Sequence, residues 1–270
     1  MTVFVKFGGS VITDKTRDET PDPAMIAQLA AEVQRALQAD PTLRLILSHG
    51  SGSFGHVYAQ RYGIHQGLAP EANWMGYART SAAALRLNRA VVDGLLRADV
   101  PALALQPSAT LRTAHGGVTR WDTAALALAL DRRLVPVVHG DVAFDEIQGC
   151  AIASTESLLV YLAQDPALRP ARVVLVGEAG VYTADPRSTP HATRIPRVDP
   201  TNIATVLHGA SGSHGADVTG GMRSKLELMW QLVQANPGME VQLIGTLPGL
   251  LARALVGTAV GEGTVIVGST

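Results

Sequence analysis

Lysine is scarce in this 270-residue chain, and so are cysteine and blocks of like charge. The single cysteine, Cys150, cannot form a disulfide within the chain, and the first residues lack the basic and apolar stretches of a secretory signal, so we expect a reducing, cytoplasmic environment. A net charge of −1 gives no electrostatic support for a nucleic-acid or membrane-surface partner. No apolar run approaches the roughly 20 residues that cross a bilayer. These absences predict a small-molecule partner.

The shortage of lysine is informative because arginine is plentiful. Of the 22 lysines and arginines, only three are lysine: Lys6, Lys15 and Lys225. An ammonium group acts as a point charge between phosphate oxygens, where the larger, planar guanidinium fits less well. All three lysines lie near glycine-rich turns, which favours a phosphate site, although chance could also place three residues near some of the 27 glycines.

Short apolar runs alternate with helical patterns along the chain. Strands are expected at 2–7, 43–48, 102–105, 135–139, 173–176, 241–244 and 264–267. Helices are expected at 23–39, 53–62, 76–98, 123–132, 156–163 and 222–235. This alternation predicts an α/β fold with a mainly parallel sheet between helices, in one domain over 1–270, and a site beyond the carboxyl ends of the strands.

Three glycine-rich turns lie where such a site should form. Gly8-Gly9-Ser10 follows the first strand, 49–56 (HGSGSFGH) follows the second, and Gly220-Gly221 precedes the helix that carries Lys225. Glycine permits close approach of the backbone to a ligand, and free amides at a helix start accept an anion. Any one of them alone could be an ordinary turn. The longer glycine-rich stretch 208–221 could be a lid or a surface loop.

Three segments carry a resemblance to a known family: 5–10 (VKFGGS), 49–56 (HGSGSFGH) and 217–225 (DVTGGMRSK). The chain has no Walker phosphate loop and no protein-kinase catalytic loop. From residue 3 to about 267 it resembles the amino acid kinase superfamily and, within it, the isopentenyl phosphate kinases. His56, at the end of the second segment, is shared with the similar fosfomycin kinases and is generally absent from the amino acid, aspartate and uridylate kinases.

The resemblance implies an open αβα sandwich that transfers the γ-phosphoryl group of ATP to isopentenyl phosphate, in a variant of the mevalonate route to isoprenoids. It also implies a homodimer. Residues mainly within 1–170 would bind the acceptor, and residues mainly within 171–270 would bind the nucleotide. The alternatives are a fosfomycin kinase, whose acceptor is a phosphonate, and a catalytically silent nucleotide-binding protein on the same fold.

The resemblance also assigns roles to individual residues. Lys6 would contact both reacting phosphates, Lys15 would stabilise the transition state, and Lys225 would act on the nucleotide side. His56 would hold the acceptor phosphate as a hydrogen-bond donor, because an anionic acceptor needs no general base; an ordinary surface histidine is the alternative. Ser51, Gly52 and Gly140 would lie along the acceptor. Further nucleotide-binding positions would be Gly8, Gly9, Ser10, Gly52, Gly180, Tyr182, Asp185 and Gly221.

Two positions depart from the family pattern. Glu156 stands where the superfamily usually has an aspartate that organises the lysines, so Glu156 either takes that role or is an exposed carboxylate at a helix start. Gly177 stands where an acidic residue is usual. Magnesium is expected to bridge the ATP phosphates, held largely by phosphate and water, and no protein ligand is assigned to it.

The acceptor tail would need an apolar pocket. Tyr77, Val142 and Ile152 could close such a pocket around a five-carbon alkenyl group. Ordinary core packing is the alternative for all three.

Overall fold

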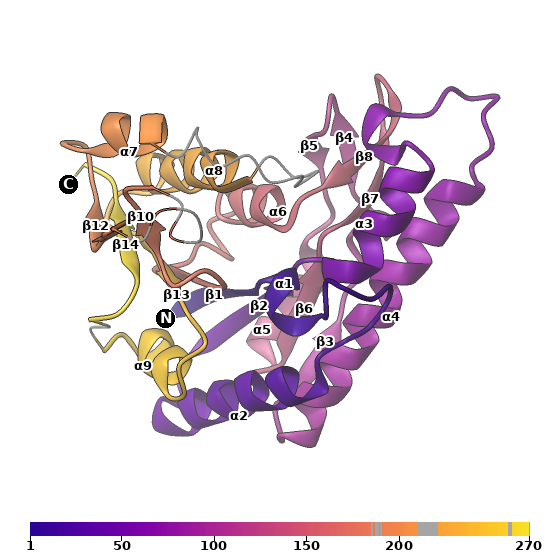
Figure 1. Ribbon diagram of the computed structural model, residues 1–270. Coiled ribbons are helices and arrows are strands. Elements are labelled where there is room, and N and C mark those ends of the chain that lie inside the picture. The colour runs from indigo at the N-terminus through magenta and orange to yellow at the C-terminus, as the bar shows by residue number, and fades with distance from the viewer. Residues whose placement is uncertain (185, 187–188, 190, 210–220, 259–260, 270) are drawn as a thin grey trace.

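The computed structural model describes residues 1–184, 186, 189, 191–209, 221–258 and 261–269. An eight-stranded sheet with the order β12-β14-β13-β9-β1-β2-β6-β3 forms its centre (Figure 1). These strands are β1 (Thr2–Phe7), β2 (Arg44–His49), β3 (Ala102–Ala104), β6 (Val135–His139), β9 (Arg172–Val176), β12 (Arg197–Val198), β13 (Glu240–Ile244) and β14 (Thr264–Val267). Within this sheet β13 and β14 pair antiparallel and the other neighbours pair in parallel. The predicted, mainly parallel sheet is confirmed.

Helices cover both faces of the sheet. On one face lie α2 (Pro23–Ala39), α4 (Met75–Arg97) and α9 (Leu250–Val256), and on the other lie α5 (Ala124–Asp131), α6 (Thr155–Leu162) and α8 (Gly221–Ala235). Figure 1 shows α2 and α9 below the sheet and α6 and α8 above it. Each layer encloses its own cluster of buried side chains. The αβα sandwich is therefore confirmed, and each predicted helix agrees with its observed counterpart to within one residue at either end.

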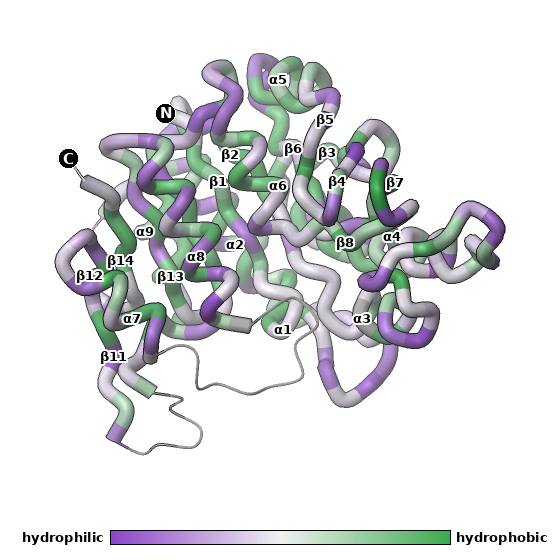
Figure 2. The backbone as a smooth tube through the Cα atoms, turned by 90° about the horizontal axis from the view of Figure 1, so that it is seen from above, coloured by the Kyte–Doolittle hydropathy of each residue, from purple (hydrophilic) through white to green (hydrophobic). Residues whose placement is uncertain are grey.

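Helix α2 shows how the local sequence produces one of these layers. Asp22 precedes Pro23, and its side chain accepts a hydrogen bond from the Met25 amide at 2.9 Å, which caps the helix start. Ile26, Leu29 and Val33 then recur at helical spacing and are buried against the sheet. Figure 2 shows the same division across the molecule, with hydrophobic residues gathered in the central strands and hydrophilic ones along the outer loops.

A second, smaller sheet was not predicted. It contains β4 (Arg112–Ala114), β5 (Gly117–Arg120), β7 (Asp141–Asp145) and β8 (Gly149–Ala153), in the order β5-β4-β7-β8. Asp145 stabilises its turns by accepting hydrogen bonds from the amides of Gly116, Ile147 and Gln148 at 2.8 to 3.0 Å. Burial alone would raise the pKa of this carboxyl, but the amides outweigh burial and hold it below its usual range. Strands of three to five residues carry too little periodicity to be found from sequence.

Several short elements complete the described chain. They are α1 (Gly9–Ile12), α3 (Gly52–Arg61), α7 (Ile203–Gly209), the paired strands β10 (Val181–Tyr182) and β11 (Arg194–Ile195), and the 3₁₀ turns η1 (Ile64–Gln66) and η2 (Pro107–Ala109). Of these only α3 was predicted. Across the described residues, no helix has the length and apolar character needed to span a membrane.

Candidate functional site

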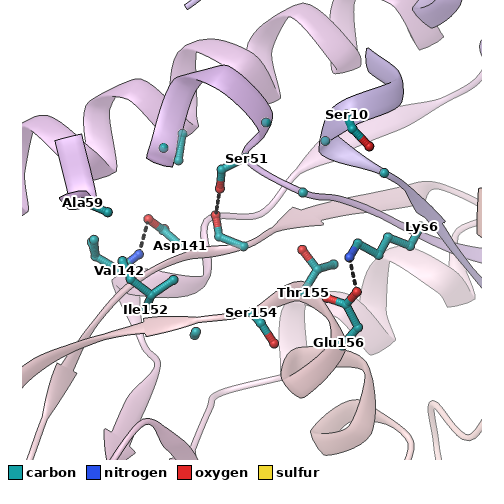
Figure 3. Close-up of a pocket in the computed structure, with 18 of the residues that line it drawn as sticks. Lys6, Ser10, Ser51, Ala59, Asp141, Val142, Ile152, Ser154, Thr155 and Glu156 are labelled. Atoms are coloured by element: carbon teal, nitrogen blue, oxygen red, sulfur yellow. Dashed lines mark hydrogen bonds and ion pairs between the residues drawn. The ribbon is translucent and has the colours of Figure 1, made fainter. Parts of the chain in front are cut away.

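The alternation of side chains along β1 directs Lys6 into the site. Val3, Val5 and Phe7 point to the face covered by α2, whereas Phe4 belongs to the core under α6 and α8. Lys6 shares the face of Phe4, because side chains two residues apart lie on the same side of a strand. The Lys6 ammonium consequently reaches the start of α6, where it pairs with a carboxylate oxygen of Glu156 (Figure 3).

The N-terminus of α6 holds Glu156 in place. Ser154 caps this helix by accepting a hydrogen bond from the Ser157 amide at 3.1 Å, which places Glu156 in the first turn. Only 8% of Glu156 is exposed, so the alternative of an exposed carboxylate is wrong. Burial alone would raise the pKa of Glu156, but the charges of Lys6 and Lys225 outweigh it and hold the pKa below its usual value. Glu156 is thus an anion close to both lysines.

The turns after β1 and β2 are in direct backbone contact, and this contact requires glycine. A Cβ atom on Gly9 would lie 2.4 Å from the Gly52 nitrogen, and one on Gly50 would lie 2.9 Å from the Gly9 nitrogen. Thr13 links the same two turns: its hydroxyl donates to the Gly9 carbonyl at 2.7 Å and accepts from the Ser53 amide at 3.1 Å. In the described structure no protein acceptor pairs with the amides of Gly9 or Gly52. Both amides can therefore bind an anion.

All three lysines of the chain line a single pocket. Figure 3 shows Lys6, Glu156 and Ser10 toward one end of this pocket and Ala59, Val142 and Ile152 toward the other. One end therefore holds the ion pair of Lys6 and Glu156, and the other combines three apolar side chains with the buried carboxylate of Asp141. The remaining lining residues are Gly8, Gly9, Lys15, Gly50, Ser51, Gly52, Gly55, His65, Thr80, Ala84, Gly140, Asp141, Ala153, Ser154, Thr155, Lys225 and Leu228.

Most of the predicted site residues meet in this pocket. Lys6, Gly8, Gly9, Ser10, Lys15, Ser51, Gly52, Gly140, Val142, Ile152, Glu156 and Lys225 all line it. Gly221 is the first residue of α8, one turn before Lys225. Gly8 also has a packing role, because a Cβ atom there would lie 2.8 Å from the Val176 carbonyl oxygen on β9.

Other predicted residues lie elsewhere. Tyr77 does not line the pocket as described; its ring stacks on Phe144 with centroids 4.9 Å apart. Gly180 and Tyr182 lie at the β10 strand, outside the lining. His56 is part of α3, but its side chain lies outside the described structure, as do Asp185 and residues 210–220 of the glycine-rich stretch.

The sequence interpretation missed Asp141 and two buried histidines. Asp141 lines the pocket, is 2% exposed, and accepts a hydrogen bond from the Val142 amide at 2.8 Å. His49 and His139 end β2 and β6, and each is followed by a glycine that lines the pocket. This repeated strand-His-Gly pattern was visible in the sequence and could have pointed to both histidines.

Comparison with known proteins identifies the family. The model of the amino acid kinase family matches residues 1–244. This chain belongs to the amino acid kinase family. It is 34% identical to the isopentenyl phosphate kinase of Methanothermobacter thermautotrophicus over 98% of this chain and 99% of the relative. It is 31% identical to the enzyme of that name from Methanocaldococcus jannaschii, over 98% of both chains.

The fold of this amino acid kinase agrees with a solved structure as well. An X-ray structure of an isopentenyl phosphate kinase superposes with a TM-score of 0.81 at 31% identity, covering 98% of this chain and all of the other. The resemblance inferred from the three sequence segments is therefore confirmed.

Proposed function

We propose that this amino acid kinase transfers the γ-phosphoryl group of ATP to isopentenyl phosphate, giving isopentenyl diphosphate and ADP. The observation that carries the proposal is a pocket lined by all three lysines, in which Lys6 and Lys225 lie close enough to Glu156 to lower its pKa. Val142 and Ile152 line the opposite end of the same pocket (Figure 3). Full-length relatives named isopentenyl phosphate kinase support it. The product, a five-carbon diphosphate, would enter isoprenoid biosynthesis through a variant of the mevalonate route.

The charged end of the pocket fits phosphoryl transfer between two anions. An oxygen of the acceptor phosphate forms a bond to the γ-phosphorus while the bond to the β-phosphate oxygen breaks, and ADP leaves with that electron pair. Lys6, Lys15 and Lys225 would neutralise charge on the transferring oxygens, and the unpaired amides of Gly9 and Gly52 would donate to them. The acceptor is already anionic, so the reaction needs no general base.

Glu156 would organise the lysines, as the usual aspartate does in the superfamily. The two lysines that act on its pKa, Lys6 and Lys225, come from opposite ends of the chain, and a single anion between them opposes their mutual repulsion. Because the carboxylate is anionic and already paired with Lys6, we assign it positioning rather than proton transfer.

The acceptor would lie along Ser51, Gly52 and Gly140, with its phosphate held by His56 and its alkenyl tail against Val142 and Ile152. Ala59 lies toward the same end as Val142 and Ile152, and its small side chain would leave room for a short tail (Figure 3). Tyr77 would support the tail pocket from behind, in the cluster that also contains Val142 and Ile152.

Residues mainly within 171–270 would bind ATP, with Lys225 at the phosphates and Gly180, Tyr182 and Asp185 toward the adenosine. In the described structure no group of three or more His, Cys, Asp or Glu side chains could hold a metal ion. We expect a magnesium ion to bind with oxygen ligands from ATP phosphates and water. When bound, magnesium would neutralise charge on the phosphates.

A homodimer and a cytoplasmic location remain predictions, which sedimentation and cell fractionation would test.

A coupled assay of ADP release tests the function. We expect ADP release with isopentenyl phosphate, slower ADP release with dimethylallyl phosphate, and none with fosfomycin. Release with fosfomycin alone would favour phosphonate phosphorylation. Nucleotide binding without ADP release from any acceptor would favour the silent binding protein.

A further inference from the structure

Two buried histidines lie directly behind the acceptor side of the pocket. β2 and β6 are parallel neighbours, and His49 is in register with His139. Alternation along each strand points both side chains to the face covered by α4, the face that Leu47 and Val137 also share. The two rings stack with centroids 5.5 Å apart and an angle of 23° between their planes, and neither residue is exposed.

Each histidine ring forms a hydrogen bond with the carbonyl group of the glycine that follows it in the chain. Nδ1 of His49 lies 3.0 Å from the Gly50 carbonyl oxygen, and Nδ1 of His139 lies 3.2 Å from the Gly140 carbonyl oxygen. A carbonyl can only accept, so both rings must carry their proton on Nδ1. Nε2 of His49 then accepts from the Asn88 side-chain amide at 3.1 Å. Nε2 of His139 is buried and has no partner in the described structure.

The two strand ends are also joined to each other. The Gly140 amide donates to the His49 carbonyl at 3.1 Å, and the Ser51 hydroxyl donates to the Gly140 carbonyl at 3.0 Å. The peptide between Gly50 and Ser51 is trans. The Ser51 N–H group therefore points in the opposite direction to the Gly50 carbonyl, which the His49 ring contacts. Fixing the carbonyls of Gly50 and Gly140 therefore fixes which groups these turns present to the pocket.

We propose that His49 and His139 are positioning residues: as a stacked, neutral pair they hold the Gly50 and Gly140 peptides in the orientation that binds the acceptor phosphate. The inference rests on the proposed function for the identity of the acceptor. Burial and the neighbouring His139 ring lower the pKa of His49 to about 3, which agrees with a neutral ring. Burial likewise lowers the pKa of His139.

The unpartnered Nε2 of His139 makes a sharp test possible. An asparagine amide can place a donor near the position of Nδ1 but has no counterpart of Nε2, whereas phenylalanine keeps the ring and loses the donor. His139→Asn should therefore keep the wild-type affinity for phosphate, and His139→Phe should bind phosphate more weakly. His49→Asn and His49→Phe should both weaken phosphate binding, because either substitution also removes Nε2, the atom that accepts a hydrogen bond from the Asn88 side chain. His191→Phe, at an exposed histidine, is the control.

Affinity for isopentenyl phosphate and for inorganic phosphate would be measured by calorimetry without ATP, followed by KM for each substrate. For His139→Phe we expect about tenfold weaker binding of both phosphates and a higher acceptor KM, since small misplacements of a binding group have large effects. The KM for ATP should stay within about twofold, and His139→Asn should stay within about twofold of wild type in every value. A general loss of structure would instead move both KM values.

Three results would overturn the proposal: unchanged phosphate affinity in His139→Phe, equal loss in His139→Asn, or a wild-type ¹⁵N spectrum with unprotonated Nδ1 on either ring. That spectrum also decides the matter if His139→Phe does not fold. If the wild-type protein releases no ADP with isopentenyl phosphate, the proposed function fails, while the calorimetry with inorganic phosphate still tests the histidines. Absence of phosphate binding by wild type would overturn the positioning role.

Discussion

Residues 1–170 and residues 171–270 contribute very unequally to the pocket. Apart from Lys225 and Leu228 of α8, every described residue that lines it comes from 1–170. In that first range Thr13 and Thr155 anchor the turns through hydrogen bonds to the carbonyls of Gly9 and His49. The first range's side of the pocket is thus fixed by hydrogen bonds within the fold, whereas the described residues of the second range reach the pocket through one helix.

Within the pocket, Glu156 connects the two ranges. It pairs with Lys6 of the first range and lies close enough to Lys225 of the second for that charge to lower its pKa. The comparison therefore predicts that substitutions of Lys6 and Glu156 lower the activity more than substitutions elsewhere in either range.

Lys6→Arg should have the largest effect. The Lys6 side chain is only 12% exposed and lies beside the backbone of Gly50, so a longer, planar guanidinium cannot occupy its place. We expect kcat to fall by about 10³-fold, the upper range for loss of one oxyanion-stabilising group. Steady-state kinetics would measure this. Arg89→Lys, the reverse exchange in an exposed ion pair, is the control and should change kcat little. A kcat within tenfold of wild type would place the reacting phosphates elsewhere.

Glu156→Gln should follow, with a loss in kcat of about 10²-fold. The substitution preserves shape but leaves Lys6 and Lys225 without the anion between them. Glu156→Asp keeps the charge that the superfamily usually has here, so it should recover much of the lost rate. If the Gln and Asp variants are equally impaired, side-chain length rather than charge matters at this junction.

Acid should destabilise the protein through the buried histidines, which belong to the first range. His49 has a pKa of about 3 in the folded protein and an ordinary value near 6.5 when unfolded, so the unfolded chain binds more protons between these limits. The free energy of unfolding should therefore fall by up to about 1.4 kcal/mol per pH unit for each histidine as pH drops below 6.5. Urea titrations from pH 6.5 to 5 would measure the slope. His139→Asn should reduce that slope, and an unchanged slope would show that His139 is not the source.

Ile152→Val should have the smallest effect. Removing one methylene from the apolar end should weaken isopentenyl phosphate binding by about 0.8 kcal/mol, or roughly fourfold. The acceptor KM would report it, with the KM for ATP unchanged. Ile195→Val, at a partly buried position in the second range, removes the same group away from the pocket and should leave both values unchanged. Equal changes in both variants would point to a general loss of stability.

The elements that sequence predicted well are those with strong periodicity. The buried strand β1 and the long amphipathic helices α2 and α4 are unambiguous patterns, and the rarity of lysine pointed to the pocket without any structural knowledge. Four-residue strands such as β5, and the antiparallel pairing of β13 with β14, depend on contacts distant in sequence and leave no local signal.

The same limit applied to the site. Glycine spacing predicted the turns, but the contact between Gly9 and Gly52 depends on β1 lying beside β2. The histidine stack likewise depends on β6 being the next neighbour of β2, which the order of the sequence does not reveal. Tyr77, near the start of the alanine-rich helix α4, was predicted to close the pocket, yet its ring stacks on Phe144.

The distribution of lysine has a practical consequence for anyone who wishes to attach this protein to a solid support. All three lysine side-chain amines in the sequence line the pocket. An amine-reactive resin that couples to a lysine would therefore tether the protein through the pocket itself. Cys150 offers no thiol alternative, because it is buried. Engineered surface lysines, or coupling through carboxylates, would be needed for a support that leaves the pocket open.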